Sequence, residues 1–488
     1  MSQYNTGALC AACVRARTWE KGIPVVPDRV WGEPDVQNAL VQWDFGRACR
    51  LIRFHGGLRQ EDMAQLTGLS QSFLSMLEKG QRRLTNIDKI IELLIGLGVP
   101  ADLIPLPLPA PPVSVVPRQP SAFAGDADPS LPWTADRMVA ALDVAVGGSE
   151  MDRRRFLTAG SVALTAFVNE WCSAEAEPLH RAAAGSRLTT GLLDSLQRTT
   201  DQLRTMDASD GSGSLASLGQ GHLRFLAHLA KESSYGESVG RRLAAIIADT
   251  ATQTGWFVFD SGDRERPLSY LYAALRAAKA AGDIRLGAGA LSYIAIYSYS
   301  TGSPHHAVSA AQRARDKISH LGTPALEAML LTRQARGHAK LGERQAAVAA
   351  LGQAADLCAA GRSEHDPDWL YWVNEGEIHG QMGSCHLDLG DPDRAAASFT
   401  KARNALNPTD HRTRGLFLTR AATAHLAQGD LEAGCATAHE ALDLAESLQS
   451  ARFDQHVESM IEQLRPVADS PYAQDVLDRR ATMLAARS

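Results

Sequence analysis

The sequence is poor in aromatic residues, in cysteine and in long apolar segments. Only 6% of its 488 residues are aromatic, so a hydrophobic core has to be built mainly from alanine and leucine, which favours helix over sheet. The seven cysteines are odd in number and scattered, as is typical of reduced cytoplasmic thiols. No apolar run reaches the length of about 18 residues that a membrane helix needs. We therefore expect an all-α cytoplasmic protein of about two to four domains.

Motifs of common catalytic sites are also absent. The sequence has no glycine-rich phosphate-binding loop, no HExxH and no GxSxG, so neither an enzymatic activity nor a cofactor is expected. Cys10 and Cys13 form a CxxC pair, which is half of a zinc site. A structural zinc needs four ligands, and no second pair follows. Cys49 or His55 could complete the set only by folding back, so no metal site is predicted.

Residues 44–85 predict three short helices joined by tight turns. Gly57 ends the first helix, and Gly68 supplies the turn after the second, because glycine enters a positive φ freely. Ser70 is a good N-cap for the third helix, which stops at Gly80. This arrangement is the helix-turn-helix pattern. Helical spacing predicts that the second and third helices bury Met63, Ala64, Leu66, Phe73, Leu74 and Leu77.

The same stretch resembles the phage-repressor-like (XRE-type) DNA-binding domains. Arg59 departs from the pattern, because the family usually has a Ser or Thr N-cap at that place. The resemblance rests on Leu58, Gln60, Met63, Ala64, Gly68, Leu69, Ser70, Gln71, Leu74, Leu77, Glu78, Lys79 and Gly80. It implies binding to double-stranded DNA through Gln60, Ser70, Gln71, Ser72, Ser75, Met76, Lys79, Arg82 and Arg83.

Within that set, the resemblance implies that Gln71, Ser72 and Met76 face base edges in the major groove. Glutamine can bond adenine at two points, whereas methionine offers only apolar contact, for instance to a thymine methyl. Local charge supports this interpretation, since seven cations and three anions lie between Arg47 and Arg83 in a protein of formal net charge −6. The alternative is a helical bundle with a solvated basic face.

Composition divides the whole chain into five predicted segments. They are an irregular extension (1–43), the helix-turn-helix domain (44–104), a proline-rich linker (105–135), connecting helices (136–185) and a repeat domain (186–488). The linker cannot be helical, because each proline removes a donor and fixes φ. Within the connecting helices, the residues RRRFL at 153–157 match a twin-arginine export pattern. A membrane-associated protein using residues 151–168 is therefore an alternative, although export signals lie at N-termini and a helix packed on the C-terminal domain is preferred.

Turns that begin with glycine recur in the C-terminal half. They are Gly262-Asp263, Gly302-Ser303, Gly342-Glu343, Gly390-Asp391 and Gly429-Asp430, with steps of 40, 40, 48 and 39 residues. A small residue stands seven positions before and twelve positions after each glycine, which allows close helix packing. The pattern resembles the tetratricopeptide repeat, best at Gly383, Gly390, Ala395, Phe399 and Ala402. The resemblance implies a superhelix of stacked helix pairs with a concave binding surface.

By this resemblance, the first helix of each pair lines the groove. The implied positions are Asp249, Thr252, Trp256, Phe259, Ser292, Tyr299, Thr332, Arg336, Lys340, Glu377 and Asp388. Charges of both signs beside aromatic rings suit a peptide or another polar ligand. Trp369, Tyr371 and Trp372 are expected in the core, with a ligand platform as the alternative. His338, His386 and His425 each precede a hinge glycine by four residues, and packing between repeats is preferred over a metal site.

These features together predict a DNA-binding transcriptional regulator. The architecture resembles peptide-sensing repressor-plus-repeat regulators of bacteria, which implies a homodimer whose repeat domain senses a peptide, another polar ligand or a partner protein. An adaptor that only tethers a partner protein to DNA remains an alternative.

Overall fold

The structure, a computed structural model, divides into two compact units, residues 1–118 and 119–488. The described residues are 26–41, 44–67, 69–82, 84, 90, 93–94, 96–99, 103, 133–147, 160–175, 177–180 and 187–487. Over these ranges the secondary structure is helical, apart from one isolated bridge between Arg187 and Ser234. The fold class is therefore all-α, as the composition predicts. The CxxC pair, the RRRFL segment and most of the proline-rich linker lie outside the described residues.

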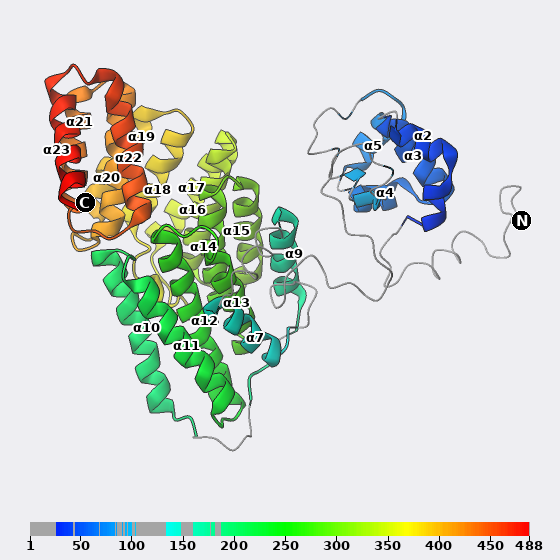
Figure 1. Cartoon of the computed structure of the whole chain (residues 1–488), viewed down its shortest axis with the longest axis horizontal. Coiled ribbons are helices and arrows are strands. Elements are labelled where there is room, and N and C mark those ends of the chain that lie inside the picture. Colours follow the sequence, from blue (N-terminus) through cyan, green and yellow to red (C-terminus); the bar gives the residue numbers. More distant parts are fainter. Residues whose placement is uncertain are drawn as a thin grey trace, which may run out of the picture. The chain divides into compact units, whose positions relative to one another are not determined.

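The N-terminal unit is a small helical domain (Figure 1). Its described elements are η2 (Asp28–Gly32), α2 (Pro34–Val41), α3 (Phe45–Gly56), α4 (Gln60–Thr67) and α5 (Gln71–Glu78). The predicted N-cap is present, since the Ser70 hydroxyl accepts a hydrogen bond from the Phe73 N–H at 3.3 Å. At the start of α4, the Asp62 carboxylate accepts from the Arg59 N–H at 2.6 Å. In a capping box, the side chain at the third helical position accepts from the N–H of the N-cap residue. This bond uses only the backbone of the N-cap residue, so it forms with Arg59 in place of a Ser or Thr.

Helices α3, α4 and α5 share one core. Met63, Leu74 and Leu77 are buried as predicted, whereas Ala64, Leu66 and Phe73 are only partly buried. The α3 and α5 backbones meet at Gly46, where an added Cβ would lie 2.3 Å from the Leu77 carbonyl oxygen.

Residues 26–41 differ from the irregular extension that was expected there. They form η2 and α2, because Val30, Val36 and Leu40 bring a buried apolar stripe against the same core. The proline and tryptophan content of this segment concealed that stripe.

The C-terminal unit is a stack of helix pairs that runs in chain order from green to red in Figure 1. Its described helices are α7 (Ala135–Gly147), α9 (Gly160–Ser173), α10 (Thr190–Asp210), α11 (Leu215–Glu232), α12 (Glu237–Asp260), α13 (Pro267–Ala281), α14 (Ile284–Ser300), α15 (Pro304–Ile318), α16 (Pro324–Lys340), α17 (Arg344–Ala360), α18 (Glu375–Asp388), α19 (Pro392–Ala405), α20 (His411–Gln428), α21 (Leu431–Ala445), α22 (Ala451–Leu464) and α23 (Pro471–Arg487). Short 3-10 turns lie between α17 and α18, at η5 (Asp368–Leu370), and between α22 and α23, at η6 (Arg465–Val467).

The predicted hinge glycines lie where the pairs turn. Gly262, Gly302, Gly342, Gly390 and Gly429 all have positive φ, and each connects the two helices of one pair from α12–α13 to α20–α21. The small residues allow the close approach that was expected. At Gly383, for example, an added Cβ would lie 2.8 Å from the Phe399 ring.

Helices α7 and α9 belong to the same unit as the repeats. Leu164, Phe167 and Trp171 of α9 are buried in the largest apolar cluster, and α9 contacts α13 and α15. Leu164, Phe167 and Val168 of the export segment considered above therefore pack on the repeat helices. No helix among the described residues combines the length and apolarity that crossing a membrane requires.

The two ends of the repeat stack meet. Helix α10 contacts α20, and α12 contacts α22. Between the ends, the Gly213 N–H donates to the Gln449 carbonyl at 2.7 Å, and the Gln449 N–H donates to the Asp210 carbonyl at 2.9 Å. Gly211 makes this approach possible, because its φ of 82° and ψ of 176° suit only glycine. The expected concave groove is therefore closed at one side into a cavity.

Candidate DNA-binding surface and ligand cavity

The first turn of α5 presents polar side chains to solvent. Gln71 and Ser72 are exposed, while Leu74 on the opposite face is fully buried. The Ser72 hydroxyl lies 3.1 Å from that of Ser70, and the Gln71 side chain makes no hydrogen bond to the described residues. The Gln71 side chain is thus free to contact a partner outside the domain.

Glu78 fixes the other end of α5. Its buried carboxylate accepts from Arg53 Nε and Nη2, both at 2.8 Å, and from Gln60 Nε2 at 3.2 Å. These bonds connect α5 to α3 and α4. A charged fork of this kind is among the stronger side-chain interactions, so the orientation of α5 is well defined.

Other implied DNA contacts lie on α5 itself or in the residues that follow it. Lys79 and Arg82 are exposed, and the Arg82 guanidinium lies 5.8 Å from the centre of the Phe73 ring. Ser75 and Met76 are partly buried. Arg83 and Gly68 lie outside the described residues.

A cavity of about 390 Å³ lies within the C-terminal unit. This volume falls in the range of about 300–1,000 Å³ that small-molecule sites occupy. Its lining comes from the first helix of each pair, from α10 to α22, and from the segments that precede α18 and α20. The charged side chains in the lining are Arg204, Asp207, Arg333, Arg336, Glu377, Asp410, Arg412, Arg420 and Arg452.

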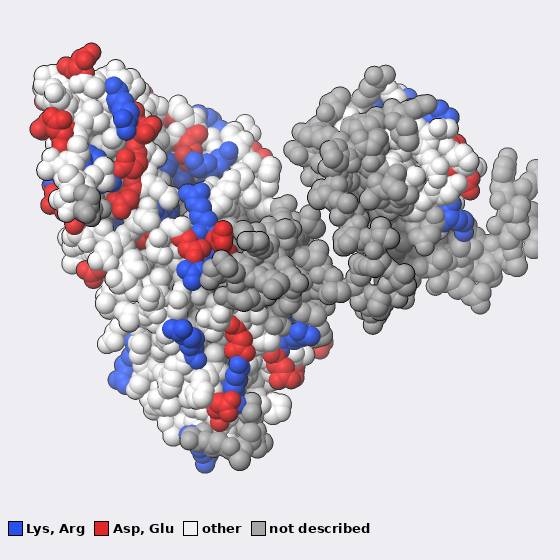
Figure 2. Space-filling model, in the orientation of Figure 1, with Lys and Arg blue, Asp and Glu red and all other residues white. Residues whose placement is uncertain are grey.

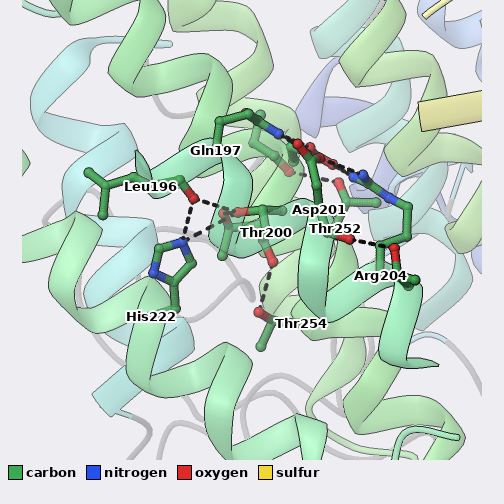
Figure 3. A network of polar contacts seen from close by, with 12 residues as sticks. Leu196, Gln197, Thr200, Asp201, Arg204, His222, Thr252 and Thr254 are labelled. Atoms are coloured by element: carbon green, nitrogen blue, oxygen red, sulfur yellow. Dashed lines mark hydrogen bonds and ion pairs between the residues drawn. The ribbon is translucent and has the colours of Figure 1, made fainter. Parts of the chain in front are cut away.

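A polar network between α10 and α12 positions Arg204 at one edge of the cavity (Figure 3). Arg204 Nη1 lies 2.9 Å from Asp201, and Arg204 Nη2 donates to Asp249. Gln197 Nε2 also donates to Asp249, at 2.9 Å. Although burial disfavours the charge of Arg204, Asp249 raises the pKa of the guanidinium above its ordinary value.

Trp256 lies where the two ends of the stack meet. Its indole N–H donates to Asp207 at 3.0 Å, and Arg412 Nε lies 3.2 Å from the same carboxylate. The guanidinium carbons of Arg412 and Arg452 lie 5.0 Å and 5.5 Å from the Trp256 ring centre. Side chains from α10, α12, α20 and α22 thus meet at one wall of the cavity.

Asp388 forms ion pairs with three cationic side chains at a second wall of the cavity. Its carboxylate lies 2.7 Å from Arg336, 2.9 Å from Arg420 and 3.1 Å from Lys340. Burial alone would raise the pKa of Asp388, but Arg336 and the other two cations hold it well below its usual range. The carboxylate therefore stays charged.

The implied groove residues divide into three groups in the structure. Trp256, Tyr299, Arg336 and Glu377 line the cavity, and Asp249, Asp388 and Lys340 form ion pairs or hydrogen bonds behind its wall. Thr252, Phe259, Ser292 and Thr332 are buried and do not line it. Of the aromatic cluster, Tyr371 and Trp372 line the cavity, whereas Trp369 packs against Gly289.

Sequence reasoning missed most of the cationic lining. Arg204, Arg333, Arg412, Arg420, Arg452 and His456 all line the cavity and were not predicted. An available signal was the concentration of arginine on the first helices of the pairs. In a typical repeat protein, arginines at these positions are exposed to solvent. Here they are buried because the two ends of the helix stack meet.

One group of side chains in the described part of the chain could share a metal ion. There, the His, Cys, Asp and Glu side chains close enough to share a cation are Glu33, Asp35 and His55. His55 Nε2 already lies 3.1 Å from Asp35 Oδ2, and that hydrogen bond lowers the pKa of the Asp35 carboxyl. His338, His386 and His425 do not form such a group.

Comparison with known proteins identifies the N-terminal motif. Residues 47–104 match the family model for a helix-turn-helix. No curated protein matches the chain. Among solved structures, a signal-transduction ATPase with numerous domains (STAND) protein with a tetratricopeptide repeat sensor, from Pyrococcus horikoshii, is similar over 96% of this chain and 74% of its own. The identity is 11% and the TM-score 0.37, so this likeness carries no argument about function.

Proposed function

We propose that the protein is a DNA-binding transcriptional regulator whose repeat unit senses a small polar ligand. The observation that carries the DNA-binding part is the exposed first turn of α5 within a segment that matches the helix-turn-helix family. Gln71 and Ser72 lie on that turn, and Glu78 fixes the opposite end of the same helix. A rigid helix with an exposed polar start is what base readout in the major groove requires.

The repeat unit supports the sensing part. A cavity whose walls come from both ends of a helix stack is suited to a switch, because a ligand in it bridges elements that are distant in sequence. Residues from Arg204 on α10 to Arg452 on α22 contribute to its lining. A ligand shifts a conformational equilibrium only if it binds one state better. Binding that stabilises the closed stack meets this condition.

Dimerisation is part of the proposal. Helix-turn-helix proteins commonly bind two half-sites about 34 Å apart, which demands a fixed spacing of two DNA-binding units. We propose that the protein binds DNA as a homodimer and that ligand changes this spacing. A proline-rich linker does not transmit a torque as a continuous helix would, so the geometry of the dimer has to carry the signal.

The proposed DNA binding can be tested by selection from genomic fragments. The full-length protein is expected to enrich a short, pseudo-palindromic sequence. A Gln71→Ala variant should enrich a sequence that has lost preference at one position of each half-site. Enrichment without any common sequence would contradict a specific regulator. The adaptor would be favoured instead if the protein stably captured a partner protein on DNA and variants in the cavity left that capture unchanged.

A further inference from the structure

One corner of the cavity holds more cationic side chains than its carboxylates can neutralise. This basic corner consists of Arg336 from α16, Arg420 from α20, and Arg452 and His456 from α22. Among the described residues, Arg452 makes no hydrogen bond or ion pair, and its guanidinium rests on the Trp256 ring. His456, one turn along α22, makes no hydrogen bond to the described residues either.

A buried donor in the same corner is also unsatisfied. Arg420 donates through Nη2 to the Ser384 carbonyl and to Asp388, but its Nε–H is buried without a hydrogen-bond partner. An unsatisfied buried donor costs about 1–3 kcal/mol, and Arg204, Arg333 and Arg412 of the same lining each carry a buried Nε–H without a hydrogen-bond partner as well. The acceptor that Arg420 and Arg452 lack is therefore expected to be a ligand.

Positive charge is in excess at this corner, whereas every arginine elsewhere in the cavity lining faces a carboxylate. Arg336, Lys340, Arg420 and Arg452 are positive, and the carboxylates beside them are Asp388 and Asp260, which leaves two positive charges in excess.

Each remaining arginine of the lining faces its own carboxylates. The pairs are Arg204 with Asp201 and Asp249, Arg333 with Glu377, and Arg412 with Asp207. The excess charge is therefore local, and it defines where an anionic group would bind.

We propose that the basic corner binds the phosphate group of a small phosphorylated molecule, which is the ligand sensed by the repeat unit. This inference rests on the proposed function and names the class of its ligand. A phosphate ester carries about two negative charges and three acceptor oxygens at neutral pH. Donors that approach from three helices suit this tetrahedral anion, whereas a planar carboxylate is satisfied by a single arginine fork.

The rest of the cavity is suited to the remainder of such a molecule. Asp207, Glu377 and Asp410 line it and offer acceptors to hydroxyl or amino groups. A small molecule is favoured over a nucleic acid, because the cations lie inside a cavity of about 390 Å³. On the surface of the repeat unit seen in Figure 2, positive and negative side chains are interspersed, and no broad basic patch is visible there.

Calorimetric titration of the full-length protein tests this inference. The probes are inorganic phosphate and pyrophosphate, with succinate as a dicarboxylate and sodium chloride to match ionic strength. Arg452→Gln is the informative variant, because the side chain that it removes makes no hydrogen bond or ion pair to the described residues. Arg394→Gln is the matched control, since it removes one positive charge from an exposed side chain of α19.

Phosphate or pyrophosphate is expected to bind the unaltered protein and the Arg394→Gln variant equally. Arg452→Gln should weaken binding about tenfold or more, as is typical of a lost hydrogen bond to a charged group. Its melting temperature without ligand should not fall, which separates a binding role from a structural one. Equal binding by Arg452→Gln, no binding of either phosphate probe, or tighter binding of succinate would overturn the inference.

DNA binding is measured separately on the same samples. A protein that binds its DNA sequence but neither phosphate probe contradicts this inference alone. A protein that binds phosphate at the corner but no specific DNA contradicts the proposed function instead.

Discussion

Arg53 and Glu78 join α3 of the N-terminal unit to the end of α5 through two bonds of 2.8 Å. Glu78 is almost completely buried, whereas the Arg53 side chain is 31% exposed. This ion pair therefore holds α3 and α5 in a fixed relative orientation. It explains how a helix of only eight residues can hold Gln71 in a constant orientation.

Loss of this pair should destabilise the DNA-binding unit. Arg53→Ala leaves a buried carboxylate with only Gln60 as its side-chain donor, and we expect a loss of about 1–3 kcal/mol in the free energy of unfolding. Urea denaturation of the full-length protein measures it. Arg47→Ala, at an exposed position of the same helix, is the control and should have little effect. In Arg53→Ala, a second change of Glu78→Gln should recover part of the loss, and no recovery would contradict the assigned pairing.

Base and phosphate contacts should respond differently to substitution. Gln71→Ala is expected to cost about 1–3 kcal/mol at one base position and to relax preference there. Arg82→Ala should weaken binding to all sequences alike and lower the salt slope by about one unit. Competition binding with single-base operator variants, repeated at several salt concentrations, distinguishes the two. An unchanged preference in Gln71→Ala would show that α5 is placed wrongly in the groove.

Closure of the repeat stack depends on Gly211. An alanine there would have to adopt a backbone conformation that is nearly exclusive to glycine, and its Cβ would lie 2.8 Å from the Gln449 carbonyl oxygen. We expect Gly211→Ala to cost about 1–3 kcal/mol and to weaken ligand binding.

The control for this change is Gly221→Ala in the middle of α11. No heavy atom lies within 4 Å of the added Cβ, so helix propensity alone should make this variant slightly more stable. Chemical denaturation compares both variants with the unaltered protein. Normal stability and ligand affinity in Gly211→Ala would mean that the ends of the stack need not meet.

His456 should report occupation of the basic corner. Burial, reinforced by the charges of Arg452, Arg420 and Arg336, holds the pKa of its imidazole well below the usual value. A bound phosphate favours the imidazolium, so it should raise this pKa. Histidine NMR with and without phosphate measures the shift. His386, which burial also holds at a lowered pKa but which does not line the cavity, should not respond.

The same group makes stability depend on pH. The unfolded chain binds a proton at His456 near pH 6.5, whereas the folded, ligand-free protein does so only at lower pH. The unfolded state therefore binds more protons below about pH 6.5, and stability should fall as the pH falls through this region. Replacing His456 by glutamine should reduce that slope. An unaltered slope would indicate that this imidazole is already protonated in the folded protein.

Local signals made much of the fold predictable. The hinge glycines, the small residues that flank them and the Ser70 cap all act within one helix pair or one turn, so spacing along the chain reveals them. The contact between Gly213 and Gln449 is different, because it joins loops more than 200 residues apart and leaves no periodic signal. Since this closure is what buries Arg412 and Arg452, sequence reasoning found Trp256 but not the cations around it.

The central claim is that occupation of the cavity controls DNA binding. The most direct test is the affinity of the full-length protein for its selected DNA sequence, measured by fluorescence anisotropy in phosphate and in sodium chloride of equal ionic strength. Allosteric coupling is typically about 1–3 kcal/mol, so the affinity should differ about fivefold or more between the two salts. Arg452→Gln should abolish the difference and Arg394→Gln should retain it. Equal affinities in both salts, or the same difference in Arg452→Gln, would contradict the account.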